Sequence, residues 1–220
     1  MDKIGLFGTG AVGRTIGTKM VELGYEVMMG SRTANNPKAL DWAMNYNKAA
    51  NGTFEDVAKW ADIIFNCTKG EVALDVLRMA GLENLKGKII IDISNPLDSS
   101  KGSPVPLIEN YVNTNSLGEE IQRLVPEGLI VKSLNMVNCD VMVNPGTCGG
   151  EATMFVAGDN EDAKQKVTQI LQQFGWKDII DLGDMTGARG MEMILPLWLK
   201  TWGATKGYHF AFKIVRPNQH

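Results

Sequence analysis

Three glycines near the start of the chain, Gly8, Gly10 and Gly13, stand at the spacing G-x-G-x-x-G. Each position meets its own mechanical requirement. The first permits a tight turn after a strand, the second lets the backbone approach a ligand, and the third lets the following helix pack closely on the strand. The first turn of such a helix offers unpaired N–H groups and the positive end of the helix dipole. The run Gly8-Thr9-Gly10-Ala11-Val12-Gly13 therefore predicts a site for the pyrophosphate of a dinucleotide.

The residues on both sides of these glycines give the motif the context that it requires. An apolar strand pattern at 3–7 precedes it, and apolar or small residues at helical spacing continue to Gly24. A second strand pattern follows at 25–29. Together they form a strand-helix-strand unit of about 30 residues, the length typical of dinucleotide binding. The alternative is a glycine-rich turn in another α/β fold.

The end of the second predicted strand reads Gly30-Ser31-Arg32-Thr33. An NAD site usually places an Asp or Glu here to bind the ribose 2′-hydroxyl, and this chain has none. A guanidinium and hydroxyls can instead bind a 2′-phosphate through charge-assisted hydrogen bonds. Ser31 and Arg32, with Lys38 as a second positive charge, therefore predict a preference for NADP(H). The alternative is a surface turn whose adenosine end is recognised in another way.

Polar residues also follow the later predicted strands, where ligands of open α/β sheets bind. Cys67, Thr68 and Lys69 are predicted near the nicotinamide ribose, and Asn95 and Asn135 near the nicotinamide and a second substrate. Asn and Ser are also common turn formers, so a purely structural role is the alternative for these positions. Lys69 could equally be a solvated lysine in a turn.

No residue pattern demands a catalytic acid, base or nucleophile, so we predict no catalytic side chain. If both reactants are cofactors, the protein need only align them and exclude water. The only histidines, His209 and His220, lie near the end of the sequence, where surface or interface roles are expected. Cys67, Cys139 and Cys148 show neither C-x-x-C nor His-paired spacing, so we predict no metal site and reduced thiols.

Composition limits the partners that we expect. The chain has 220 residues and a formal net charge of −3, which argues against nucleic acid as the main partner. The most apolar C-terminal stretch is interrupted by Glu192, Lys200 and several glycines, and no signal segment is visible. We therefore expect no membrane span and a cytoplasmic location.

Strand and helix patterns alternate along most of the chain, which is typical of a doubly wound, mainly parallel sheet of Rossmann type in the α/β class. Further strands are predicted at 61–68, 88–94, 128–134, 153–157 and 178–181, with helices at 37–49, 70–79 and 161–174. Residues 97–105 predict a mobile loop near the ligand site. We predict two parts, an NADP-binding Rossmann-like domain at 1–180 and a small helical segment at 181–220.

The C-terminal segment carries a predicted helix at 191–201 that is apolar around most of its circumference. Such a helix is buried on several sides, and a chain of this length cannot cover it fully. Its surplus apolar face predicts a homodimer contact combined with a wall against a planar ligand, with simple core packing as the alternative.

These segments, in this order, resemble the NADPH-dependent reductases of the deazaflavin coenzyme F420 and related F420-dependent NADP oxidoreductase-like proteins. The marks are the glycine turn with Gly17 further along the helix, Gly30-Ser31-Arg32, and the run Asp181-Leu182-Gly183 leading to Leu195-Pro196-Leu197. The resemblance implies that residues 9–12 bind pyrophosphate, that Ser31 and Arg32 hold the 2′-phosphate, and that the C-terminal part of a dimer covers the deazaflavin. It also implies hydride transfer between NADPH and a flat, flavin-like acceptor.

Two departures affect the acceptor pocket. Thr68-Lys69-Gly70 stands where the family often has Ile-Pro-Trp, and Asn135 stands where a His follows the corresponding strand. The same domain also resembles the reductase part of membrane metalloreductases, which makes FMN or FAD an alternative acceptor to coenzyme F420. The sequence therefore predicts an NADP(H)-dependent oxidoreductase with a small-molecule hydride acceptor. The alternatives are an imine or pyrroline-carboxylate-type reductase and a non-catalytic NADP(H)-binding sensor.

Overall fold

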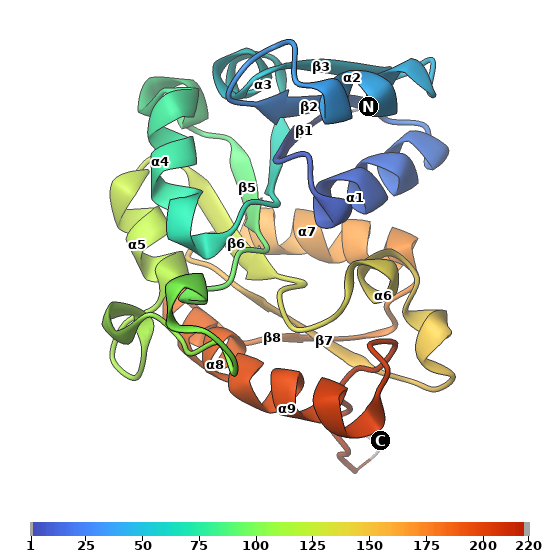
Figure 1. Cartoon of the computed structure of the whole chain (residues 1–220), viewed down its shortest axis with the longest axis vertical. Helices are drawn as coiled ribbons and strands as arrows, with labels where there is room; N and C mark the ends of the chain where they lie inside the picture. The colour runs from blue at the N-terminus through green and yellow to red at the C-terminus, as the bar shows by residue number, and fades with distance from the viewer. Residues whose placement is uncertain (1, 218–220) are drawn as a thin grey trace.

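The computed structural model describes residues 2–217 and contains an eight-stranded sheet in the order β3-β2-β1-β4-β5-β6-β7-β8 (Figure 1). The strands are β1 (Lys3–Phe7), β2 (Glu26–Ser31), β3 (Ala49–Thr53), β4 (Ile63–Asn66), β5 (Ile89–Asp92), β6 (Leu129–Ser133), β7 (Thr153–Ala157) and β8 (Asp178–Asp181). The α-helices are α1 (Ala11–Glu22), α2 (Pro37–Met44), α3 (Phe54–Trp60), α4 (Gly70–Ala80), α5 (Leu117–Leu124), α6 (Cys139–Val143), α7 (Glu161–Phe174), α8 (Ala188–Met193) and α9 (Leu195–Thr205). Short 3-10 helices span Leu82–Leu85, Ser99–Lys101, Glu109–Tyr111, Pro145–Cys148 and Met185–Gly187.

The order of the strands gives the sheet its class. Strands β1 to β6 are parallel and run in the order 3-2-1-4-5-6, the order of the doubly wound dinucleotide-binding fold. Strand β7 is antiparallel to β6, and β8 is parallel to β7. The predicted Rossmann-type, mainly parallel α/β fold is therefore confirmed. Its strand order reverses between β1 and β4, where ligands of such sheets bind.

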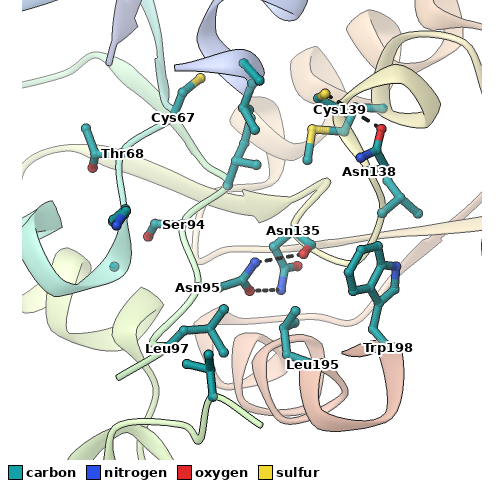
Figure 2. Close-up of a pocket in the computed structure, with 18 of the residues that line it drawn as sticks. Cys67, Thr68, Ser94, Asn95, Leu97, Asn135, Asn138, Cys139, Leu195 and Trp198 are labelled. Atoms are coloured by element: carbon teal, nitrogen blue, oxygen red, sulfur yellow. Dashed lines mark hydrogen bonds between the residues drawn. The ribbon is translucent and has the colours of Figure 1, made fainter. Parts of the chain in front are cut away.

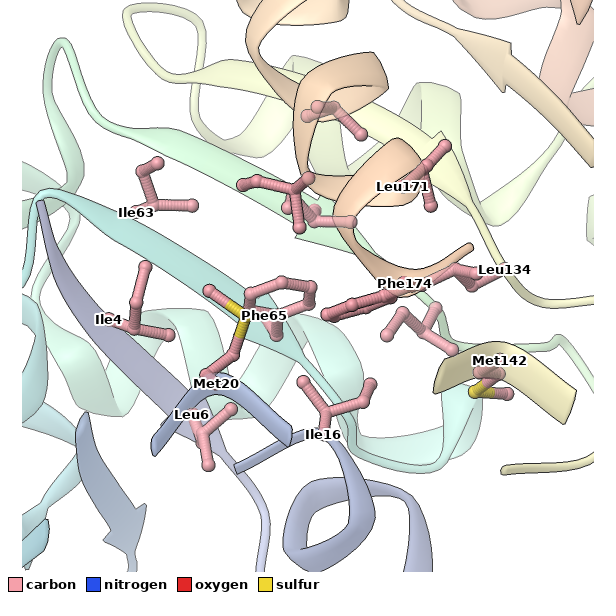
Figure 3. Packing of buried hydrophobic residues seen from close by; sticks show 14 of the residues in the cluster. Ile4, Leu6, Ile16, Met20, Ile63, Phe65, Leu134, Met142, Leu171 and Phe174 are labelled. Atoms are coloured by element: carbon pink, nitrogen blue, oxygen red, sulfur yellow. The ribbon is translucent and has the colours of Figure 1, made fainter. Parts of the chain in front are cut away.

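Helices cover both faces of the sheet because its strands are apolar on both sides. One core cluster joins α1, α2, α6 and α7 to strand residues such as Leu6 and Phe65, and Figure 3 shows part of this packing. A second cluster joins α3, α4, α5 and Ala188 of α8 to the opposite face, through residues such as Phe7 and Ile64. Neighbouring residues of one strand thus enter different cores, which is the pattern of a sheet buried on both sides.

Local capping chemistry explains where several helices begin and end. Asn36 accepts backbone N–H groups at the start of α2, and Thr53 with Asp56 forms a reciprocal capping box on α3. Asn160 caps the start of α7, and Gly175, in the left-handed conformation with φ of 104°, ends it.

Two predicted elements were wrong in extent. The helix predicted at 37–49 ends at Met44, and Ala49–Thr53 forms strand β3 instead. The helix predicted at 191–201 is two helices, α8 and α9, which meet at Ile194. Pro196 follows that junction and has no backbone N–H to continue the helix from α8, so it begins a new one. The sequence patterns also missed the short helices α3, α5 and α6.

A buried ionic cluster joins the sheet to the C-terminal segment. Lys132 of β6 is fully buried, and its ammonium lies 2.7 Å from Asp92 Oδ2 on β5 and 2.8 Å from Glu192 Oε1 on α8. Burial alone lowers the pKa of Lys132, but the carboxylates of Asp92 and Glu192 outweigh it and raise the pKa above its ordinary value. Lys132 therefore remains a cation between two strands and a helix.

Glu192 also anchors a second element. Its two carboxylate oxygens accept the backbone N–H groups of Leu117 and Gly118, at 2.8 and 3.0 Å, in the first turn of α5. Burial raises the pKa of Glu192, and Lys132 offsets part of that rise. The carboxyl group of Glu192 thus also lies at the positive end of a helix. One side chain of α8 holds both α5 and β6 in place.

We predict that Glu192→Ala lowers the free energy of unfolding by about 3–5 kcal/mol, because it leaves the Lys132–Asp92 pair without its second carboxylate and uncaps α5. Denaturant titration followed by circular dichroism measures the change. Glu22→Ala, at an exposed position of α1, is the control and should change stability by less than about 0.5 kcal/mol. Equal stability of the two variants would contradict the anchoring role of Glu192.

Candidate functional site

The glycine turn between β1 and α1 has the geometry that the sequence predicts. Gly8 has φ of 114°, in the region that favours glycine, and its N–H donates to Gly30 O on β2. A Cβ at Gly13 would lie 2.3 Å from Gly8 O, so any larger residue would separate helix from turn. A Cβ at Gly10 would meet no protein atom within 4 Å. Gly10 is therefore dispensable for packing, and its missing side chain leaves space beside the start of α1.

The N-terminus of α1 is open to an anion. Gly10 is the N-cap residue and supplies no side-chain hydrogen bond to the first turn, which also contains no acidic residue. The guanidinium of Arg14 donates a hydrogen bond to Thr9 O at 2.8 Å and so stabilises the turn. The N–H groups of the first helical turn are thus left for a ligand, and the helix dipole favours a negatively charged one.

The end of β2 carries the predicted adenosine-side residues. Ser31 is buried and its hydroxyl donates to Thr33 O at 2.6 Å, which shapes the turn and leaves the hydroxyl lone pairs as acceptors. Arg32 and Lys38 are exposed, and Lys38 lies in the first turn of α2. These residues lie outside the lining of the main pocket, as the adenosine side of a dinucleotide site would.

The main pocket lies beyond the carboxyl ends of β4, β5 and β6 and has a volume of about 500 Å³ (Figure 2). Of the predicted site residues, it brings together Ala11, Val12, Cys67, Thr68, Lys69, Asn95 and Asn135. Helix α9 forms another wall with Leu195, Trp198 and Leu199, and Leu97 and Val105 contribute from the loop after β5. The predicted nucleotide turn and the C-terminal segment therefore border one cavity, of the size usual for small-molecule sites.

A hydrogen-bonded network beneath the pocket sets its polar floor. Thr68 Oγ1 donates to Asn66 Oδ1 at 2.7 Å, and Asn66 Nδ2 donates to Asp92 Oδ1 at 2.9 Å. Ser94 Oγ donates to the same carboxylate oxygen at 2.7 Å. The other oxygen of Asp92 accepts from Lys132. The buried ionic cluster thus extends to Thr68 and Ser94, two side chains that line the pocket.

Asn95 and Asn135 form a pair across the ends of β5 and β6, drawn with dashed lines in Figure 2. Asn95 Nδ2 donates to Asn135 O at 2.9 Å, and Asn135 Nδ2 donates to Asn95 Oδ1 at 2.8 Å. Asn135 Nδ2 also donates to Met191 O of α8 at 2.6 Å. The pair therefore binds the C-terminal segment to the floor of the pocket.

Burial and position set the properties of the cysteines and of His209. Cys67 and Cys139 line the pocket, and burial raises the pKa of both thiols, which keeps them protonated and poor nucleophiles. His209 Nε2 lies 3.1 Å from Asp140 Oδ2 at the surface, away from the pocket lining. His220 lies outside the described residues.

Residues 2–217 contain neither a metal-binding cluster nor a membrane-spanning helix. No group of three His, Cys, Asp or Glu side chains there is arranged to hold a metal ion. Within the same residues, every helix is too short or too polar to cross a bilayer.

Sequence reasoning missed several lining residues. Asn138 caps α6, and Cys139 and Met142 lie on it; this helix of five residues is too short for a periodic signal. Leu195 and Trp198 lie on the segment that the sequence predicts as a wall, but which of its faces turns toward the pocket depends on the break at Ile194.

The chain is similar to known NADP-dependent reductases. Residues 3–96 match the family model described as NADP oxidoreductase, coenzyme F420-dependent. A candidate F420-dependent NADP-reductase from Arthrobacter sp. FB24 is 44% identical, covers 98% of this chain over its own full length, and superposes with a TM-score of 0.94. The F420-dependent NADP reductase of Methanothermobacter marburgensis is 25% identical over 87% of this chain and 88% of its own.

A third relative is longer. The metalloreductase STEAP3 of Rattus norvegicus is 28% identical over 91% of this chain, which spans only 38% of that protein. The match to the Arthrobacter protein, by contrast, covers 98% of this chain and 100% of that one. The chain belongs to the family of coenzyme F420-dependent NADP oxidoreductases.

Proposed function

We propose that this protein is an NADP(H)-dependent oxidoreductase that transfers hydride between NADPH and a flat, flavin-like acceptor. One observation carries the proposal: the pocket is lined both by Ala11 and Val12, at the predicted pyrophosphate turn, and by Leu195 and Trp198 of the C-terminal wall. A dinucleotide that enters from the turn would thus end beside an apolar and aromatic surface suited to a second ring.

The residues present fit the nucleotide. The open space at Gly10 and the uncapped start of α1 suit the pyrophosphate, while Arg32, Ser31 and Lys38 suit a 2′-phosphate. Bound NADPH would supply the hydride from its nicotinamide. The order of the strands supports this placement of the nucleotide, because β2 and β1 would receive its adenosine half and β4 to β6 its nicotinamide half.

The protein's own contribution is alignment. Thr68, Ser94 and the Asn95–Asn135 pair form a floor whose hydrogen bonds are fixed from beneath, and Leu195 and Trp198 add an apolar wall. Holding two rings in contact in a dry, rigid site removes much of the entropic barrier to transfer. We assign no general acid or base to a side chain.

Relatives suggest which acceptors to test. Some curated relatives are named F420-dependent NADP reductases and others metalloreductases, so a deazaflavin, FMN and FAD are the candidates. Structural neighbours under 20% identical include a reductive aminase from Aspergillus terreus, at a TM-score of 0.66, and this likeness concerns the fold alone. An imine or pyrroline-carboxylate-type reductase and a non-catalytic NADP(H) sensor are the alternatives.

Loss of NADPH absorbance with a panel of a deazaflavin, FMN, FAD and a cyclic imine tests the proposal. We expect oxidation with at least one planar tricyclic acceptor. Gly10→Val should keep its circular dichroism spectrum, since the added Cβ meets no protein atom, and should lose both binding and turnover. Tight NADPH binding without oxidation across the panel would favour the sensor, and turnover with the imine alone would favour the imine reductase. Absence of any NADPH binding would contradict all three assignments.

Arg32 should determine the choice of nucleotide. We predict that Arg32→Ala weakens NADPH binding by about ten- to a hundredfold and leaves NADH nearly unchanged, because only NADPH carries the 2′-phosphate. Calorimetry measures both affinities. Arg78→Ala removes an exposed arginine on α4 and is the matched control. Equal weakening of NADPH and NADH would refute a phosphate contact at Arg32.

We also propose that residues 1–180 act as the nucleotide-binding part, that residues 181–220 cover the acceptor, and that the protein is a cytoplasmic homodimer. Support for the dimer comes from large apolar side chains that stay exposed in the C-terminal segment, among them Leu197, Trp202 and Tyr208. Leu197 is 55% exposed and lies on α9 outside the pocket lining. A second copy of this chain would cover this surface by twofold contact.

Light scattering in line with gel filtration tests this assembly. Wild type should elute as a dimer at micromolar concentration, and Leu197→Glu should yield monomers because a buried carboxylate would oppose the contact. The control Met44→Glu places the same charge on another apolar side chain, which is more exposed and lies on α2, and this variant should remain dimeric. A monomeric wild type would contradict the dimer, and a monomeric variant with full NADPH oxidation would separate the dimer from acceptor binding.

A further inference from the structure

The amide oxygen of Asn135 is a buried acceptor for which the described residues provide no donor. Asn135 is 3% exposed, lines the pocket, and its Oδ1 makes no hydrogen bond. An unpaired buried carbonyl costs free energy, and because Asn135 lines the pocket, a ligand bound there is the candidate for the missing donor.

The orientation of this amide follows from two backbone carbonyls. Asn135 Nδ2 donates to Met191 O, which can only accept, so the nitrogen must face α8. Asn95 Nδ2 likewise donates to Asn135 O, which leaves Asn95 Oδ1 as an acceptor for the second N–H of Asn135. Exchanging N and O in either side chain would place two acceptors face to face. The unpaired atom of Asn135 is therefore an oxygen.

The side chains at the neighbouring strand ends also offer only hydrogen-bond acceptors to the pocket. Ser94 must donate its proton to Asp92, the carboxylate partner of Lys132, and Thr68 must donate to Asn66 Oδ1, because Asn66 Nδ2 is held by Asp92. Both hydroxyls thus keep only lone pairs for the pocket. The buried charge of Lys132 and Asp92 in this way makes Thr68 and Ser94 acceptors, beside the acceptor of Asn135.

We propose that Asn135 is a specificity residue whose Oδ1 accepts an amide N–H of a planar ring bound in this pocket, and that the nicotinamide carboxamide of the nucleotide supplies it. The inference rests on the proposed function. The carboxamide is favoured over the imide of a flavin-like acceptor because the strand order brings the nicotinamide half over β4 to β6. The ribose hydroxyls of that half are donors that match Thr68 and Ser94.

Two nucleotide analogues test the contact in the wild-type protein. The thionicotinamide analogue of NADP⁺ keeps the carboxamide nitrogen, whereas the 3-acetylpyridine analogue replaces that nitrogen by a methyl group. By calorimetry we expect the thionicotinamide analogue to bind within about twofold of NADP⁺ and the acetylpyridine analogue about tenfold more weakly. In Asn135→Ala, NADP⁺ and the acetylpyridine analogue should bind alike.

The other possible results overturn either the carboxamide contact or the proposed function. Equal wild-type affinity for NADP⁺ and the acetylpyridine analogue overturns the carboxamide contact while the proposed function stands, and no NADP⁺ binding at all overturns the proposed function itself. FMN and its N3-methyl derivative test the second source of an amide N–H. If methylation weakens FMN binding in wild type but not in Asn135→Ala, while the nucleotides are not distinguished, the acceptor rather than the nucleotide contacts Asn135.

Discussion

The site depends on the two ion pairs made by the fully buried ammonium of Lys132. This ammonium lies between Asp92 on β5 and Glu192 on α8, so one cation joins the parallel sheet to the C-terminal segment. A buried pair of this kind adds little net stability over apolar packing, yet losing one partner is costly. Its role here is to hold neighbouring elements and side chains in position. Glu192 holds the start of α5, and Asp92 directs the protons of Ser94 and, through Asn66, of Thr68.

The pocket is a consequence of this arrangement. Residues of the sheet end and of α9 face each other across this pocket, and α8 is held at the end of β6 by Glu192 and by the Met191–Asn135 hydrogen bond. In Figure 1, α8 and α9 lie along the same end of the molecule as β7 and β8, away from β2 and β3. The glycine turn is thus built by local chain geometry, whereas the α9 wall of the pocket is brought into place by long-range contacts. A rigid floor and an apolar wall suit a reaction in which two cofactors exchange hydride and the protein aligns them.

The features that sequence reasoning predicted well obey local rules. Gly8, Gly10 and Gly13 have fixed mechanical roles, and apolar strands buried on both faces are easily recognised, so the mainly parallel sheet and the glycine turn could be predicted. Strand β3 was missed because Ala-Ala-Asn-Gly-Thr has little apolar or β-branched character. The capping of Gly118 by Glu192 joins residues 74 positions apart, and no local pattern can indicate it. For the same reason the sequence could not indicate that Asn135 bonds to Met191 of α8 and to Asn95 after β5.

Transfer of deuterium from NADPH labelled at C4 of the nicotinamide tests the central claim of direct, aligned hydride transfer most directly. A deazaflavin is the suitable probe, because the carbon that receives the hydride does not exchange it with water. Mass spectrometry of the reduced deazaflavin should show the label transferred from one face of the nicotinamide and retained in the product. Reduced product without label, or label released to solvent, would contradict an alignment mechanism in this pocket.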